Sequence, residues 1–180
     1  MSRQIRVIAG KYRGQQLIAP QAKAVRITKE RAKEAVFSAL SRYINGRNVL
    51  DLFAGSGSLG IESLSRGAHS CIFNEIDFKT FQNLKTNTNF ITEEISLHCK
   101  DYRETLELIP KNSISLVFLD PPYSYEMAEI LTEVMAANIL TNDAIIVCET
   151  NEKFNFVTIN EEVKHYRYGN THITIIWREK

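Results

Sequence analysis

The chain has 180 residues, 44% of them hydrophobic and 24% charged, which is typical of a single globular domain with a sizeable core. Its apolar runs, such as residues 144–148, are too short to span a bilayer, and residues 1–10 lack the apolar core of a secretory signal, so we expect a cytoplasmic protein. Cys71, Cys99 and Cys148 lie far apart, which excludes a C-x-x-C motif and predicts three buried thiols, with no zinc site or disulfide framework.

Positive charge is concentrated at the start of the chain. Residues 1–47 hold 11 of the 22 Lys and Arg but only Glu30 and Glu34 among the acids, a net charge of +9, whereas residues 48–180 carry −8. Such a segment is typical of a polyanion-binding surface, although a merely solvated face is equally compatible. We expect residues 1–47 to form a basic N-terminal extension and residues 48–180 the main domain, within one compact unit.

The pattern of apolar residues predicts a small N-terminal unit followed by an α/β domain. Residues 4–10 and 14–20 predict a hairpin, and Thr28 is a suitable N-cap for a helix that runs to Ile44 and stops at Gly46. Strands are then predicted at 48–53, 70–76, 95–99, 114–120 and 144–150, and helices at 58–66, 78–91, 102–109 and 126–140. Runs at 154–168 and 172–179 predict a closing hairpin. The prediction is a Rossmann-like, mostly parallel seven-stranded sheet with a C-terminal antiparallel hairpin.

A glycine-rich segment, FAGSGSLGIE at 53–62, follows the first strand of this domain. Gly55, Gly57 and Gly60 fit the spacing G-x-G-x-x-G, which is typical of loops that bind dinucleotides. Glu75 ends the next strand, where an acid can accept hydrogen bonds from ribose hydroxyls. These features suit a nicotinamide dinucleotide and S-adenosylmethionine equally.

Asp51 favours S-adenosylmethionine, because a carboxylate beside the loop would repel a pyrophosphate and attract an ammonium or a sulfonium. Asp101 follows the third strand and can accept a hydrogen bond from an adenine amine, with Tyr102 or Ile76 against the ring. A bracing or capping role for Asp51 is also compatible. An N-cap role for Asp101 is as compatible as the adenine contact.

The segment FLDPPYSYE at 118–126 predicts a site for an aromatic amine. Pro121 and Pro122 remove two N–H donors directly after a buried strand, which leaves the Asp120 carboxylate and two carbonyls as acceptors. These acceptors suit an exocyclic –NH2, and Tyr123 offers a face on which its ring could stack. A rigid turn with an aromatic plug is the structural alternative.

The motifs VLDLFAGSGSLGIESLSRGA, FNEID and LDPPY resemble the S-adenosylmethionine-dependent methyltransferases of the RsmD family, which modify the N2 amine of a guanine in 16S ribosomal RNA. The resemblance extends through RVIAGKYRGQQL and VRITKERAKEAVFSAL to YGNTHITIIW, and it implies a class I methyltransferase fold. One departure is Ile27, where the family pattern commonly has Pro, and it affects only the approach to the following helix.

The resemblance also implies roles for individual residues. Those expected to hold the cofactor are Asp51, Phe53, Ala54, Gly55, Gly57, Glu75, Ile76, Asp101 and Tyr102. Those expected to hold the target guanine are Asp120, Pro121, Pro122 and Tyr123. The residues expected to grip RNA phosphates are Arg6, Lys11, Arg13, Lys23, Arg26 and Arg31. The implied cofactor is S-adenosylmethionine without a metal, and the implied partner is ribosomal RNA, naked or within a small-subunit particle, bound by a monomer.

Rival hypotheses share parts of this pattern. An amino methyltransferase acting on adenine N6 in DNA, or on another RNA, would have the same cofactor site and D-P-P-Y motif. A protein-glutamine methyltransferase usually has Asn where this chain has Asp120. A nucleic-acid-binding module with a degenerate cofactor site is disfavoured by Asp51, Glu75 and Asp120, and a dehydrogenase rests on the glycines alone.

Overall fold

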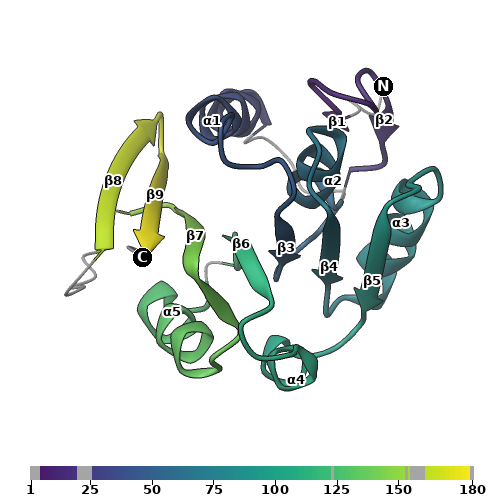
Figure 1. Cartoon of the computed structure of the whole chain (residues 1–180). Coiled ribbons are helices and arrows are strands. Elements are labelled where there is room, and N and C mark those ends of the chain that lie inside the picture. Colours follow the sequence, from purple (N-terminus) through teal and green to yellow (C-terminus); the bar gives the residue numbers. More distant parts are fainter. Residues whose placement is uncertain (1–4, 20–25, 123, 153, 155–160, 179–180) are drawn as a thin grey trace.

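The computed structural model describes residues 5–19, 26–122, 124–152, 154 and 161–178, with the backbone alone for 26–30 and 161. Two short strands, β1 (Ile5–Arg6) and β2 (Gln16–Leu17), pair as the predicted N-terminal hairpin. The main sheet has the order β5-β4-β3-β6-β7-β9-β8 (Figure 1). Its strands are β3 (Asn48–Asp51), β4 (Ser70–Asn74), β5 (Glu94–His98), β6 (Ile114–Leu119), β7 (Leu140–Thr150), β8 (Glu161–Tyr168) and β9 (Thr171–Arg178).

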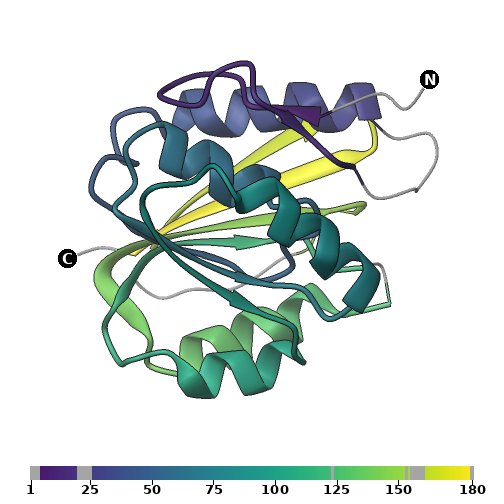
Figure 2. The ribbon, with the colours of Figure 1, turned by 90° about the vertical axis from the view of Figure 1, so that its right-hand side faces the viewer.

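Five helices cover the two faces of this sheet (Figure 2). They are α1 (Arg26–Ala39), α2 (Ser58–Ser65), α3 (Phe78–Thr88), α4 (Tyr102–Leu108) and α5 (Met127–Ala136). Strands β3 to β7 are parallel, and β9 and β8 add the antiparallel edge. The predicted mostly parallel, seven-stranded sheet with a C-terminal hairpin is therefore confirmed.

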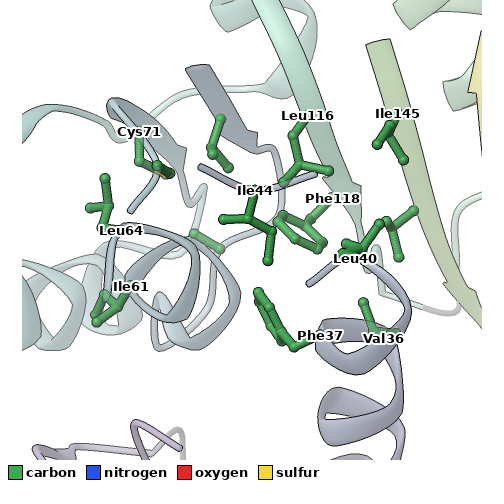
Figure 3. Packing of buried hydrophobic residues seen from close by; sticks show 14 of the residues in the cluster. Val36, Phe37, Leu40, Ile44, Ile61, Leu64, Cys71, Leu116, Phe118 and Ile145 are labelled. Atoms are coloured by element: carbon green, nitrogen blue, oxygen red, sulfur yellow. The ribbon is translucent and has the colours of Figure 1, made fainter. Parts of the chain in front are cut away.

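Two apolar layers sandwich the sheet because its central strands are buried on both faces. On one face, Phe37 of α1 and Leu40, just after that helix, pack toward Leu116 and Phe118 of β6, in a cluster that also takes in α2 and α3 (Figure 3). On the other face, α4 and α5 pack over the alternate strand residues, including Val117. The near-continuous apolar strands follow from this double burial.

The strand registers bring three acidic strand ends to one edge of the sheet. Asp51, the last residue of β3, pairs with Phe73 on one side and Phe118 on the other. Glu75 and Asp120 each follow two residues beyond those partners. The chain order reverses between β3 and β6, which is the switch point where open α/β sheets bind ligands.

The bounds of α1 differ from those predicted. The helix begins at Arg26, so Thr28 lies inside it and is not its N-cap. It ends at Ala39. The N–H of Leu40 still donates to the carbonyl of Val36, as in a helix, but the chain then turns. Ile44 is only 1% exposed. The apolar spacing that predicted a longer helix therefore reflects the burial of Ile44 in the turn after the helix.

The end of α5 was also predicted wrongly, since the helix stops at Ala136 and not at 140. Asn138 adopts a left-handed φ of 57°, which ends the helix. The carbonyl of Ile139 then accepts hydrogen bonds from the N–H groups of Ser113 and Ile114, so this segment already pairs with the sheet. Tertiary pairing thus overrides the helical pattern of residues 137–140.

The N-terminal hairpin is fastened to α2 by buried polar contacts. Glu62, fully buried, accepts hydrogen bonds from the N–H groups of Ile8 (2.8 Å) and Ala9 (3.1 Å), and Lys33 of α1 lies 3.1 Å from the same carboxylate. Gly10 has a φ of 85°, and a Cβ there would lie 1.8 Å from the Ser65 carbonyl oxygen. Only glycine allows this close approach.

Two further predictions concern the cysteines and the membrane. Cys71 and Cys148 are buried as predicted, but Cys99 is exposed, because it lies just past the end of β5 and outside both core clusters. Among the helices within the described ranges, none combines the length and the apolar character that crossing a membrane requires.

Candidate active site

The segment that follows β3 contains three glycines with different roles, two in the loop before α2 and one inside α2. Gly55 and Gly57 have φ values of 55° and 79°. A Cβ on Gly57 would lie 2.6 Å from Leu84, whereas the position of a Cβ on Gly55 has no atom within 4 Å. Gly55 therefore borders open space that a ligand can enter. Gly60 has no such role: a Cβ there would lie 2.3 Å from the Phe73 ring, so it serves helix–sheet packing.

Asp51 lies beneath this loop and is 2% exposed. Its Oδ2 accepts a hydrogen bond of 3.0 Å from the N–H of Gly60, so the bracing role is present. Burial raises the pKa of Asp51 to about 7. The nearby carboxylates of Asp120 and Glu75 also raise this pKa, whereas the positive charge of Lys33 lowers it. A buried acid among acids ionises more readily when a cation arrives. This electrostatic environment favours a positively charged ligand.

Both carboxylate oxygens of Glu75 accept hydrogen bonds from backbone N–H groups. Oε2 accepts from the N–H of Gly55 at 2.9 Å, and Oε1 accepts from the N–H of Asp77 at 2.8 Å. A carboxylate has about four lone-pair sites, so ribose hydroxyls could still donate to it. Glu75 thereby ties the glycine loop to the end of β4, and the adjacent Ile76 side chain is 55% exposed.

Asp101 and Tyr102 begin α4. The Asp101 side chain accepts from the N–H of Arg103 at 2.9 Å, which is the N-cap role considered above. The Tyr102 ring is 2% exposed and packs against Phe53 at 5.3 Å and Tyr125 at 5.9 Å between centroids. Burial raises the pKa of Tyr102 strongly. Of the two residues predicted to lie against a purine, Ile76 is therefore the one with an open side chain.

The segment after β6 rests on this aromatic cluster. Asp120 is partly exposed, Pro121 is buried and Pro122 is exposed. The N–H of Tyr125 donates to the Pro122 carbonyl at 3.0 Å, and its ring lies 5.8 Å from that of Phe53. Tyr123 lies outside the described residues. Sequence analysis missed Tyr125; its only signal was the second tyrosine of the Y-S-Y segment.

The candidate RNA-binding cations differ in their surroundings. Lys11 forms an ion pair of 2.7 Å with Glu93 and a hydrogen bond of 2.6 Å with Thr92, and the Tyr12 hydroxyl also contacts this loop. Lys11 therefore links the N-terminal turn to the segment after α3. Exposed side chains without such a link are those of Arg6, Arg13 and Arg31, while Arg26 is the first residue of α1 and Lys23 lies outside the described residues.

The candidate site thus brings carboxylates and aromatic rings from several strand ends together around the glycine loop. Within the described part of the chain, no group of three or more His, Cys, Asp or Glu could hold a metal ion.

Comparisons with known proteins place the chain among similar sequences. The family model described as conserved hypothetical protein 95 matches residues 5–177. The YlbH protein of Bacillus subtilis is 39% identical over 81% of this chain and 82% of its own length. Ribosomal RNA small subunit methyltransferase D of Haemophilus influenzae is 34% identical over 86% of this chain and 83% of its own length.

The same architecture is present among solved structures. The yhhF protein of Escherichia coli superimposes with a TM-score of 0.85 at 26% identity, covering 98% of this chain and 99% of that one.

Proposed function

The chain belongs to the conserved hypothetical protein 95 family together with ribosomal RNA small subunit methyltransferase D, and on this premise we propose that it methylates the N2 amine of a guanine in small-subunit ribosomal RNA. S-adenosylmethionine supplies the methyl group. The observation that carries the proposal is the meeting of Asp51, Glu75 and Asp120 at the carboxyl ends of β3, β4 and β6. The reaction takes place in the cytoplasm, where the ribosomal substrate is made.

The cofactor has two cationic groups that suit the acidic floor of the site. Asp51 would lie near its ammonium and sulfonium, and a positive charge there would lower the raised pKa of this carboxyl. Glu75 would accept hydrogen bonds from its ribose hydroxyls, and the backbone at Gly55 would allow close approach because no atom occupies the space beside it. Asp101 and Ile76 would lie by its adenine.

The target amine meets an acceptor-rich segment. The Asp120 carboxylate and the carbonyls of Asp120 and Pro121 accept its two N–H bonds, because the prolines contribute no donors of their own. Holding both N–H bonds would orient the nitrogen lone pair away from these acceptors, and the bound cofactor would supply the methyl group that the nitrogen takes up. Asp120 stabilises the positive charge that develops and is the nearest acceptor for the proton released.

The base must leave its stack to reach this segment. Arg6, Arg13 and Arg31 are three exposed cations of the basic N-terminal segment, and they can hold the surrounding phosphates. Adenine N6 is the alternative acceptor amine, since it would use the same acceptors.

The test is methyl transfer from labelled S-adenosylmethionine to 16S ribosomal RNA and to small-subunit particles from cells that lack the enzyme. The modified nucleoside is identified by mass. We expect N2-methylguanosine with the wild type and at least a hundredfold lower rate with Asp120→Ala, at unchanged cofactor affinity. N6-methyladenosine would overturn the guanine assignment, and cofactor binding without transfer to either acceptor would overturn the RNA substrate.

A further inference from the structure

We propose that the tip of the C-terminal hairpin is a second RNA-binding surface, which holds a phosphate beside the target nucleotide. The hairpin tip is defined here as Arg167, Tyr168, Gly169, Asn170 and His172. This inference rests on the proposed function, because it assigns a further contact to the same RNA. It adds a surface outside the basic N-terminal segment.

The sheet register places the hairpin tip at the catalytic edge. Cys148 of β7 pairs with Leu119, the residue before Asp120, and two residues on Thr150 pairs with His172 of β9. His172 in turn pairs with Arg167 of β8. The two or three strand spacings from β6 to β9 and β8 amount to about 10 to 14 Å.

Charge is distributed unevenly along this hairpin. Residues 163–172, VKHYRYGNTH, contain two cations, two histidines, two tyrosines and no acid, whereas Glu161 and Glu162 stand at the far end of β8. Lys164 forms an ion pair with Glu162 at 2.7 Å, so its charge is balanced there. The positive charge that remains lies at the tip, where Arg167 is exposed.

Arg167 presents its guanidinium in a fixed orientation. Its Nε donates to the Gly169 carbonyl at 3.0 Å, which folds the side chain over the turn. Within the described residues, its two terminal nitrogens have no acid or carbonyl partner. His172 is its cross-strand neighbour on the same face of the sheet, where directly opposed side chains lie about 5 Å apart. A guanidinium held beside an imidazole suits a phosphate.

The surface chemistry favours RNA over a protein partner. Protein interfaces depend on buried apolar or aromatic anchors. The large hydrophobic side chains that are exposed in the described residues are Ile18, Tyr43, Ile76, Phe78 and Leu108, and none belongs to the hairpin tip. Glu149, the last acid of β7, has an interaction partner.

The test compares Arg167→Gln with Lys111→Gln, which removes an exposed positive charge from the segment before β6, at the end of the sheet opposite the catalytic edge. Methyl transfer is measured on naked 16S ribosomal RNA and on small-subunit particles, both unmethylated, at several salt concentrations. We expect Arg167→Gln to raise KM for RNA about fivefold and to lower the salt slope of log KM by about one, with kcat and cofactor affinity unchanged. Arg167→Lys should recover part of the loss, because it keeps the charge.

Equal KM values for Arg167→Gln and Lys111→Gln would overturn the proposal, as would a loss confined to kcat. A loss with particles but not with naked RNA would also overturn it, because the contact would then be to a protein of the particle. If the wild type transfers no methyl group to RNA, the proposed function fails instead, and the two failures are distinguishable.

Discussion

Replacing Asp51 by Asn tests whether ionisation of the buried carboxyl beneath the glycine loop lowers the stability of the fold. In the wild type, the N–H of Gly60 donates to Asp51 at 3.0 Å. Asn keeps an acceptor for this N–H but cannot ionise. The pKa of Asp51 rises from 3.8 to about 7 because the group is buried. The folded protein therefore binds this proton more tightly than the unfolded chain.

The sign and the size of the effect follow from that difference. A raised carboxyl pKa contributes most to stability below pH 3.8, and the contribution is lost as the pH rises to about 7. The whole shift corresponds to about 4 kcal/mol, of which about 2 kcal/mol falls between pH 5 and pH 7. Burying the Asn amide costs about 1–3 kcal/mol at every pH, so the pH slope is the cleaner signal.

The assay is urea denaturation of the wild type and Asp51→Asn at half-unit steps from pH 5 to pH 8. We expect the stability of the wild type to fall relative to the variant by about 3 kcal/mol over this range. Asp77→Asn is the matched control, because Asp77 is an exposed helix N-cap whose pKa is lowered, so its titration lies below this window. Parallel curves for the wild type and Asp51→Asn would refute the reasoning.

Three further predictions test the glycine loop, the packing of α2 on the sheet, and the attachment of the N-terminal hairpin to Glu62. Gly60→Ala should lower the free energy of unfolding by about 1–3 kcal/mol, since the new Cβ meets the Phe73 ring, while the folded fraction still binds cofactor in calorimetry. Gly55→Ala should cost only about 1 kcal/mol, from its positive φ, yet abolish cofactor binding; retained binding would show that the ligand does not approach there. Glu62→Gln should cost about 3 kcal/mol in urea denaturation, because it removes the charge that Lys33 faces; a loss below 1 kcal/mol would contradict this.

Strands and strand-end residues could be predicted because their signals are local. A buried β strand is a short apolar run, and the residue after it lies at the edge of the sheet, so Asp51, Glu75 and Asp120 could be grouped before any coordinates. Parallel pairing then requires only that the registers match, which they do. Local pattern therefore sufficed for the frame of the candidate site.

The features that could not be predicted depend on contacts distant in sequence. Lys11 meets Glu93 across 82 positions, and nothing near either residue signals the pair. The ring of Tyr102 enters the core because Phe53 and Tyr125 pack on it. Asn138 ends α5 because the next residues pair with the sheet, and this overrides a good helical pattern.

The fit between Gly10 and Ser65 has a consequence for engineering substrate choice. The N-terminal hairpin cannot be exchanged for that of a relative as an independent module, because its position depends on the end of α2 and on the Glu62 carboxylate. A graft would have to transfer these positions together. Under the proposed function, changing which RNA the enzyme recognises would therefore require changes in α2 together with the N-terminal hairpin.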